Sequence, residues 1–213
     1  MRVLLGGFAP FGGSDLNPSW EAVRRLDGIQ ATDHVELFAT KLPVSYSEAA
    51  DRLFASVRVI CPEVIIIVGQ AGGRHAINPE IYAVNKSDSE NPDNEGVILK
   101  NQLIANDGPE NYTSTLPVQD MVNAIRQLGI PAELSESAGS FVCNHVFYKL
   151  MHQLKQSRSS KLAGFIHVPY LPEQLNGDEL PSLVIDQITD ALLQSAIVSA
   201  EAYLKTIDLS KSV

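Results

Sequence analysis

The sequence predicts an α/β domain built on a mainly parallel central sheet, with helices on both faces in an α/β/α sandwich. Three short β-rich segments contain consecutive apolar residues without strict alternation, which is typical of strands buried on both sides: Arg2–Leu5, Val64–Val68 and Phe165–Val168. Segments with helical periodicity separate and follow these strands. The length of 213 residues fits a single domain over residues 1–213.

The first predicted helix lies between the first two strands. Its apolar residues form one stripe between Ala49 and Ile60. Ser45 and Glu48 have the spacing of a capping box, and Pro62 provides the stop. We therefore expect a helix that begins just after Ser45 and ends before Pro62.

Three further helices complete the predicted alternation. One follows the apolar stripe Val118–Leu128, with Pro117 at its start and Gly129 at its end. The next carries the apolar side chains of Cys143–Leu154, and the last is predicted over Pro181–Lys205. Strands and helices thus alternate through the chain, as in parallel-sheet proteins.

Composition excludes several classes of protein. Hydrophobic residues make up 45% and charged residues 19%, which is enough apolar surface for a core and argues against disorder. Sixteen Lys and Arg against twenty-five Asp and Glu leave a formal charge of −9, which disfavours nucleic acid as a partner. The densest apolar run, Val64–Val68, is far shorter than the roughly 20 residues of a membrane span. The start of the chain is better interpreted as a strand than as a signal peptide, and two cysteines fit a reducing, cytoplasmic location.

Three loops follow the predicted strands and mark the expected site. They are residues 9–17, residues 69–74 and the turn after His167. Ligands of open α/β sheets bind beyond the carboxyl ends of the strands, where such loops meet. The glycine-rich loops Phe8–Gly13 and Gly69–Arg74 match no phosphate-binding motif, so they are interpreted as tight turns. The rings of Phe8 and Phe11 are either core residues or the walls of a slot for a flat ligand.

Cys143 is the candidate nucleophile. It ends a segment of small residues, 137–144, that runs directly into a predicted helix, so it lies in the first turn. Free N–H groups and the positive end of the helix dipole favour a thiolate there and can hold an oxyanion. A buried, inert role remains the alternative for a free cysteine. Cys61 lies at a helix end, which lacks these features, and we assign it a structural role.

His167 is the candidate base, because it is the histidine that ends an apolar strand segment. His75, which follows the second glycine loop, is the second choice. No two histidines have the spacing of metal ligands, so we expect no metal. An acid that orients the imidazole could be any of 25 carboxylates; Glu80 follows the glycine loop closely, but composition does not select it.

Four motifs together resemble the type I pyroglutamyl peptidases, also called pyrrolidone-carboxylate peptidases, a family of cysteine exopeptidases. In chain order they are Gly7–Gly13 with Asn17–Ser19, Gly69–Arg74, Ser137–Asn144 and His167–Pro172. The resemblance implies that Cys143 is the nucleophile, His167 the base and Glu80 its orienting acid. It also implies an α/β/α fold, a homotetramer, no cofactor, and removal of an N-terminal pyroglutamyl residue from peptide substrates.

The resemblance further implies which residues surround the pyroglutamyl ring. An uncharged lactam suits a largely apolar slot with a few fixed polar groups. The backbone of Gln70 would hydrogen-bond the lactam amide. The residues implied to bind substrate are Phe8, Phe11, Gln70, Phe141 and Val142.

Two positions depart from the family pattern. Ile81 follows Glu80 where the family usually has arginine, and Glu90 stands where an arginine usually precedes Pro-Asp-Asn. The sequence therefore predicts that a positive charge is missing near the site. An inward Glu90 would oppose the oxyanion, whereas an outward one is favoured because burying an unpaired carboxylate is costly. Two alternatives to the peptidase are a cysteine amidase acting on another small lactam or amide, and a weakly catalytic or non-catalytic ligand-binding relative.

Overall fold

A six-stranded sheet forms the centre of the computed structural model, which describes residues 1–175 and 177–210. The strand order is β2-β3-β1-β4-β8-β5, and the four inner strands are parallel. The two outer strands pair antiparallel with their neighbours. The strands are β1 (Arg2–Phe8), β2 (Gln30–Thr32), β3 (Val35–Leu42), β4 (Val64–Gln70), β5 (Asn78–Pro79) and β8 (Leu162–Val168).

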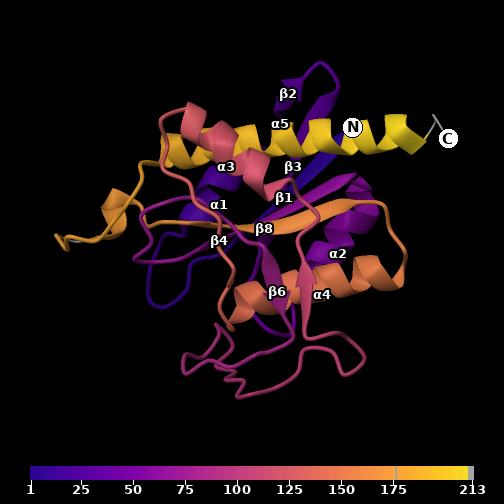
Figure 1. Cartoon of the computed structure of the whole chain (residues 1–213). Helices are drawn as coiled ribbons and strands as arrows, with labels where there is room; N and C mark the ends of the chain where they lie inside the picture. The colour runs from indigo at the N-terminus through magenta and orange to yellow at the C-terminus, as the bar shows by residue number, and fades with distance from the viewer. Residues whose placement is uncertain (176, 211–213) are drawn as a thin grey trace.

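Helices cover both faces of this sheet, so the predicted single-domain α/β fold is confirmed (Figure 1). Helices α1, α3 and α5 pack on one face, and α2 and α4 on the other. Outside the sheet, β6 (Tyr82–Val84) and β7 (Asn111–Thr113) form a small antiparallel ribbon. The α-helices are α1 (Pro18–Val23), α2 (Ala49–Ile60), α3 (Val118–Gln127), α4 (Val142–Gln156) and α5 (Ile185–Ser210).

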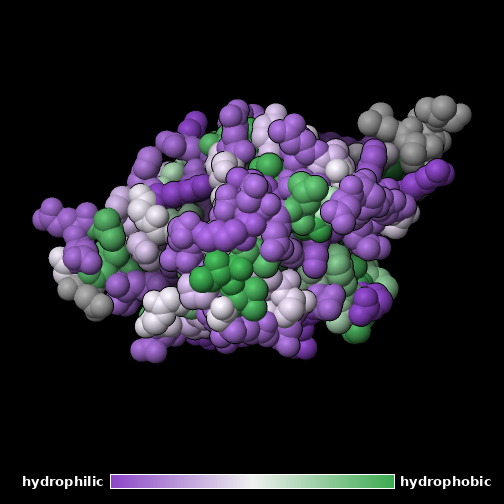
Figure 2. Space-filling model, turned by 90° about the horizontal axis from the view of Figure 1, so that it is seen from below, coloured by the Kyte–Doolittle hydropathy of each residue, from purple (hydrophilic) through white to green (hydrophobic). Residues whose placement is uncertain are grey.

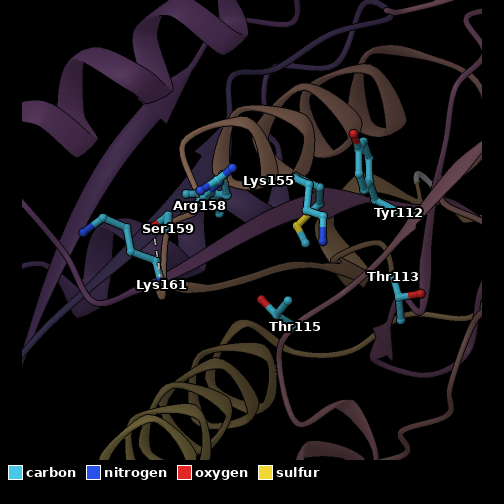
Figure 3. Close-up of a pocket in the computed structure, with 9 residues that line it drawn as sticks. Tyr112, Thr113, Thr115, Lys155, Arg158, Ser159 and Lys161 are labelled. Atoms are coloured by element: carbon cyan, nitrogen blue, oxygen red, sulfur yellow. Dashed lines mark hydrogen bonds between the residues drawn. The ribbon is translucent and has the colours of Figure 1, made fainter. Parts of the chain in front are cut away.

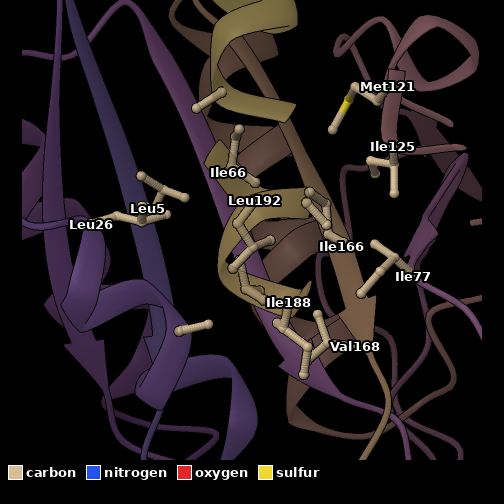
Figure 4. Close-up of a cluster of buried hydrophobic side chains, with 14 of the residues drawn as sticks. Leu5, Leu26, Ile66, Ile77, Met121, Ile125, Ile166, Val168, Ile188 and Leu192 are labelled. Carbon is tan, nitrogen blue, oxygen red and sulfur yellow. The ribbon is translucent and has the colours of Figure 1, made fainter. Parts of the chain in front are cut away.

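Alternate residues of β4 and β8 enter two separate cores. On one face, Ile66 and Ile166 pack with Leu192 of α5 (Figure 4). On the other face, Ile67 and Phe165 pack in a second cluster with α2 and α4. Burial on both faces explains the continuous apolar runs from which these strands were predicted.

The last helix begins later than its sequence pattern predicts. We expected it from Pro181, but α5 begins at Ile185. The Leu183 N–H donates to the Tyr170 carbonyl at 3.0 Å, and Ser182 forms a β-bridge with Tyr170. These contacts hold the preceding segment extended against the chain that leaves β8.

The first predicted helix, α2, begins at Ala49 and ends at Ile60, close to the prediction. The Ser45 hydroxyl accepts a hydrogen bond from the Glu48 N–H at 3.1 Å. The N-cap residue is Glu48, however, and its side chain makes no capping hydrogen bond, so the predicted capping box with Ser45 as N-cap is wrong. The same hydroxyl also donates to Glu95 at 2.9 Å. This contact connects the start of α2 with the long segment 85–110, which runs between β6 and β7.

The surface on the side of segment 85–110 is mainly hydrophilic, with several separate hydrophobic areas (Figure 2). Exposed apolar side chains of this segment are Val97, Ile98 and Leu103. Among the residues that the structure describes, no helix combines the length and the apolarity needed to cross a bilayer.

Candidate active site

The carboxyl ends of β4 and β8 bring the candidate base beside the candidate nucleophile. Gly69 of β4 pairs in register with His167 of β8. A Cβ atom added to Gly69 would lie 2.9 Å from the Cys143 sulfur, so that sulfur sits directly over the strand. In-register residues of neighbouring strands, about 4.8 Å apart, project to the same face. His167 and Cys143 therefore lie on the same face of the sheet, the face that α4 covers.

Cys143 is the second residue of α4, as the sequence predicts. Phe141 occupies the N-cap position, and its side chain caps no helix N–H group. The first backbone group to bond back is the His145 N–H, which donates to the Phe141 carbonyl at 3.1 Å. The N–H groups of the first turn therefore have no intrahelical acceptor.

His167 is held by a buried carboxylate. Its Nδ1 lies 2.7 Å from Glu80 Oε1, and the two residues are 4% and 0% exposed. A carboxylate accepts and cannot donate, so Nδ1 carries the proton in this bond and Nε2 is the proton acceptor of the neutral ring. The backbone fixes Glu80 as well, because its N–H donates to the Phe165 carbonyl at 2.9 Å. The structure thus brings Glu80 to the imidazole.

A cation lies at the site, although neither Ile81 nor Glu90 supplies the arginine that the family usually has at those positions. Arg74 Nη1 donates to Glu80 Oε1 at 2.8 Å, and Nη2 donates to the Ser137 carbonyl at 3.0 Å. Sequence reasoning placed Arg74 in a motif but assigned it no role. The available signal was its position at the end of a glycine turn that follows a buried strand.

The charges of this group support one another. Burial alone would raise the pKa of Glu80, but the hydrogen bond and charge of His167, with that of Arg74, hold it below the usual value. Burial lowers the pKa of His167, and its contact with Glu80 opposes that effect. The resting imidazole is therefore neutral at pH 7, with an ionised carboxylate behind it.

The thiol differs from the prediction. The helix terminus was expected to favour a thiolate, yet burial, followed by the nearby Glu80 charge, raises the pKa of Cys143 to about 12. Its own backbone N–H and the charge of Arg74 act in the opposite direction but are weaker. Position in a first turn does not reveal burial, which is why the sequence predicted the wrong sign. The resting pair is a neutral thiol beside a neutral imidazole.

Every residue predicted to bind substrate lines one small cavity with Cys143. The rings of Phe11 and Phe141 face each other there, with centroids 6.3 Å apart. The cavity holds about 10 Å³, roughly the space of one water molecule, so the rings must separate to admit a ligand. Its lining residues are Phe8, Phe11, Asn17, Val44, Gln70, Phe141, Val142 and Cys143.

Gln70 presents backbone groups to this cavity. The next residue, Ala71, donates its N–H to the Val168 carbonyl of β8 at 2.9 Å. In a parallel sheet, the backbone groups of successive residues point to the neighbouring strands on opposite sides. Because Ala71 bonds to β8, the backbone groups of Gln70 point toward β1. The last β4 residue paired with β1 is Val68, which leaves Gln70 beyond the ladder. The Gln70 side chain is separately engaged, since its Oε1 accepts from Gln174 at 2.9 Å.

The second departure from the family pattern, Glu90, lies away from the site. Its side chain is 92% exposed and forms an ion pair with Lys100. Its loop nevertheless reaches the site, because the Asn94 side chain donates to the Pro10 carbonyl at 2.9 Å. Glu90 therefore points outward, as predicted from the cost of burying an unpaired carboxylate.

The other candidates of the sequence lie elsewhere. The His75 side chain is 67% exposed and pairs with Glu133 at 3.3 Å, so this second choice of base does not face the thiol. Cys61 is exposed in a left-handed turn that ends α2. In the described ranges, no three His, Cys, Asp or Glu side chains are grouped as a metal site would require.

A larger cavity of about 610 Å³ lies at the carboxyl end of α4 (Figure 3). Lys155, Arg158 and Lys161 are among its lining residues, as are Tyr112 and Thr115. None of its lining residues is a Cys, His, Asp or Glu, so this cavity contains neither a thiol nor an imidazole. The small cavity at Cys143 is therefore the candidate active site.

The site has a thiol at a helix terminus and, on the same face of the sheet, an imidazole that is hydrogen-bonded to a buried carboxylate. This set of groups is typical of cysteine peptidases. The family model described as pyroglutamyl peptidase matches residues 1–203. The pyrrolidone-carboxylate peptidase of Bacillus licheniformis is 45% identical over 199 residues, 93% of this chain and 92% of that protein. That of Pseudomonas fluorescens is 44% identical over 198 residues, 93% of this chain and 92% of that protein.

Solved structures agree with these relatives. The crystal structure of pyroglutamyl peptidase I from Bacillus amyloliquefaciens has a TM-score of 0.91 and 42% identity, covering 94% of this chain and 97% of that one. A mutant pyrrolidone carboxyl peptidase from Pyrococcus furiosus also has a TM-score of 0.91, with 37% identity, covering 95% of this chain and 99% of that one. The chain belongs to the pyroglutamyl peptidase family.

Proposed function

We propose that this protein removes an N-terminal pyroglutamyl residue from peptides, with Cys143 as nucleophile, His167 as general base and acid, and Glu80 holding the imidazole. One observation carries the proposal. The Cys143 sulfur lies over Gly69, the in-register neighbour of His167, and His167 Nδ1 is bonded to buried Glu80. The names of the relatives supply the substrate class.

The reaction begins from the neutral pair. As the sulfur of Cys143 attacks the carbonyl carbon that joins pyroglutamate to the next residue, its proton passes to His167 Nε2. Glu80 stabilises the imidazolium that forms. The carbonyl oxygen becomes an oxyanion, which the free N–H groups at the start of α4 are placed to receive.

Two further steps complete the turnover. The imidazolium of His167 gives its proton to the leaving amine, the C–N bond breaks, and a thioester forms on Cys143. Water then loses a proton to His167 and attacks the thioester carbonyl. Pyroglutamate leaves, and the sulfur recovers its proton from the imidazolium. No cofactor takes part in this proposal.

Selectivity follows from the small cavity. The rings of Phe8, Phe11 and Phe141 supply flat apolar walls that suit an uncharged lactam. The backbone of Gln70 supplies a hydrogen bond that a prolyl ring, which lacks the lactam carbonyl, cannot match.

The rest of the peptide has a path beside this cavity. A groove of about 700 Å³ shares Phe11 and Gln70 with it and continues past Tyr170. Residues that follow pyroglutamate in a substrate would lie along this groove. A long peptide therefore fits as well as a short amide.

The test is release of a chromophore from a pyroglutamyl amide, with the matching prolyl amide as control. We expect hydrolysis of the first only, its loss in Cys143→Ala and its retention in Cys61→Ala. Equal hydrolysis of both amides, or of other small lactam amides, would contradict the assignment and favour a general cysteine amidase. No hydrolysis by the wild type would favour a ligand-binding relative.

We propose, in addition, that the protein assembles as a homotetramer in the cytoplasm. Exposed Val97, Ile98 and Leu103 support an interface on the side of segment 85–110, where hydrophobic areas reach the surface (Figure 2). The exposed free thiol of Cys61 supports a reducing compartment. Light scattering after size-exclusion chromatography tests the assembly: a tetramer mass is expected, and a monomer would contradict it.

A further inference from the structure

Arg74 connects two parts of the site that lie far apart in the sequence. Its Nη1 bonds to Glu80 Oε1, the same oxygen that accepts the hydrogen bond from His167. Its Nη2 bonds to the Ser137 carbonyl, in the loop that leads to Cys143. One planar guanidinium therefore touches both the carboxylate behind the base and the loop before the nucleophile.

The backbone around Arg74 is shaped for this contact. Gly73 has a φ of +84°, a left-handed conformation that favours glycine, and the Arg74 N–H donates back to the Ala71 carbonyl at 3.3 Å. A Cβ on Gly72 would lie 2.1 Å from the Tyr170 hydroxyl oxygen. The turn after β4 thus reverses closely against the chain after β8 and directs Arg74 to Glu80.

The carboxylate depends on this partner. Glu80 is fully buried, and Oε2 has no hydrogen-bond partner within the described residues. Arg74 and His167 both donate to Oε1, and the side chain of Ser135 also helps to lower the pKa of Glu80. An ionised carboxylate in such a place loses stability when a charged partner is removed.

We propose that Arg74 is a positioning residue for the reaction, which keeps Glu80 ionised behind His167 and fixes the loop before Cys143. This inference rests on the proposed function, because the reaction uses the three residues that Arg74 organises. Arg74 touches neither the cavity lining nor, in this proposal, the substrate. It acts through Glu80 and Ser137.

The charged groups around the imidazole determine how the pH profile responds. His167 faces Glu80, which raises its pKa, and Arg74, which lowers it. The same two charges shift the pKa of the Cys143 thiol in the same directions: Glu80 raises it and Arg74 lowers it. The nearby carboxylate of Glu133 is paired with His75. Loss of the Arg74 charge should therefore raise the pKa of both His167 and Cys143.

The experiment compares Arg74→Gln and Arg74→Lys with Arg52→Gln, which removes an exposed arginine of α2. We expect Arg74→Gln to lose at least about tenfold in kcat with KM changed less than about threefold, because a positioning defect acts on the transition state. The acid limb of its kcat/KM profile should move to higher pH. Arg74→Lys should have a kcat and a pH profile between those of Arg74→Gln and the wild type. The lysine keeps the positive charge but can replace only one of the two guanidinium contacts. Arg52→Gln should match the wild type.

Alkylation of Cys143 by iodoacetamide across the same pH range needs no peptide substrate, so it tests Arg74 even if the proposed function fails. We expect the Arg74→Gln profile to shift to higher pH. An unchanged kcat and unchanged pH profiles would overturn the proposal. A second result would also overturn the proposal: both Arg74→Lys and Arg74→Gln have lower activity and a lower melting temperature, but unshifted pH profiles. Arg74 would then have a purely structural role.

Discussion

At the scale of single residues, the proposed base and the proposed nucleophile of the site are both uncharged at rest. Burial lowers the pKa of His167 and raises the pKa of the Cys143 thiol to about 12. In the reaction proposed above, proton transfer to Nε2 accompanies attack, and Glu80 stabilises the charge that appears on the ring.

Glu80→Gln tests the role of the carboxylate. The amide keeps the shape but removes the charge and can present a donor to Nδ1, which would favour the wrong tautomer. We expect kcat/KM to fall by at least about a hundredfold, in the range for loss of acid–base help. The measurement is hydrolysis of a pyroglutamyl amide, with circular dichroism to verify folding. A folded variant with the wild-type rate would return Glu80 to a merely structural role.

Glu90 offers the opposite case. Its side chain is exposed and paired with Lys100 at the surface, so its charge is screened by solvent. We expect Glu90→Gln and Glu90→Arg to keep kcat/KM within about twofold of the wild type, as for most surface sites. Assays at low and moderate salt provide the check. A rise in kcat for the arginine variant alone would show that position 90 reaches the oxyanion.

The sequence predicts Cys143 and His167 from local context but not Glu80 or the role of Arg74. Cys143 begins a helix and His167 ends a strand, features that a few neighbouring residues determine. Glu80 lies 87 positions before His167, and the resemblance to a family was needed to select it. The contact of Arg74 with Ser137 spans 63 positions and has no local pattern.

At the scale of secondary-structure elements, the end of β4 sets how closely α4 approaches the sheet. Gly69 leaves room for the Cys143 sulfur and for the ring of Phe165, whose Cζ would lie 2.7 Å from an added Cβ. Both neighbours belong to the packed face beneath α4. Any side chain at this position would displace the thiol or the ring.

Gly69→Ala tests this close approach. We expect kcat/KM to fall by about a hundredfold, because a displacement near 1 Å can cost that much in a preorganised site. Gly6→Ala is the matched control. Gly6 lies in β1, away from the thiol, and its added Cβ would lie 3.1 Å from a methyl carbon of Leu42. Kinetics and melting temperature would be measured for both. Equal activity losses at equal melting temperatures would contradict the special role of Gly69.

The sequence predicts elements that are long or buried on both faces, and misses the others. β4 and β8 have continuous apolar runs, so they are evident. β3 was not predicted, because half-buried Phe38 and Ala39 interrupt the alternation that begins with buried Val35 and Leu37. α1 has only six residues, too few for a periodic stripe. The start of α5 depends on pairing with Tyr170, which no local pattern encodes.

At the scale of the whole molecule, buried histidines couple folding to pH. His145 is 7% exposed, and its Nδ1 lies 2.8 Å from the Ser87 hydroxyl. Burial, followed by the charge of Lys149, lowers the pKa of His145 from 6.5 to about 4. The unfolded chain therefore binds a proton more readily than the folded one, so stability falls as pH drops from about 6.5 toward 4.

Replacing His145 should flatten this dependence. At about 1.4 kcal/mol for each pKa unit, the shift corresponds to roughly 2–4 kcal/mol of stability lost by pH 4. We expect His145→Gln to be less stable at pH 7 but to lose less stability on acidification, whereas His34→Gln, at an exposed position, should follow the wild type. Urea unfolding at several pH values measures both. Identical slopes in all three proteins would contradict the role of His145.

In the proposed reaction, Cys143 forms a thioester with the pyroglutamyl group. Rapid acid quenching during turnover, followed by digestion and mass spectrometry, detects such an intermediate directly. We expect one added pyroglutamyl group on the peptide that contains Cys143, absent from Cys143→Ala and unaffected by Cys61→Ala. A pyroglutamyl group on Cys61 or another residue, or hydrolysis by Cys143→Ala at the wild-type rate, would contradict it.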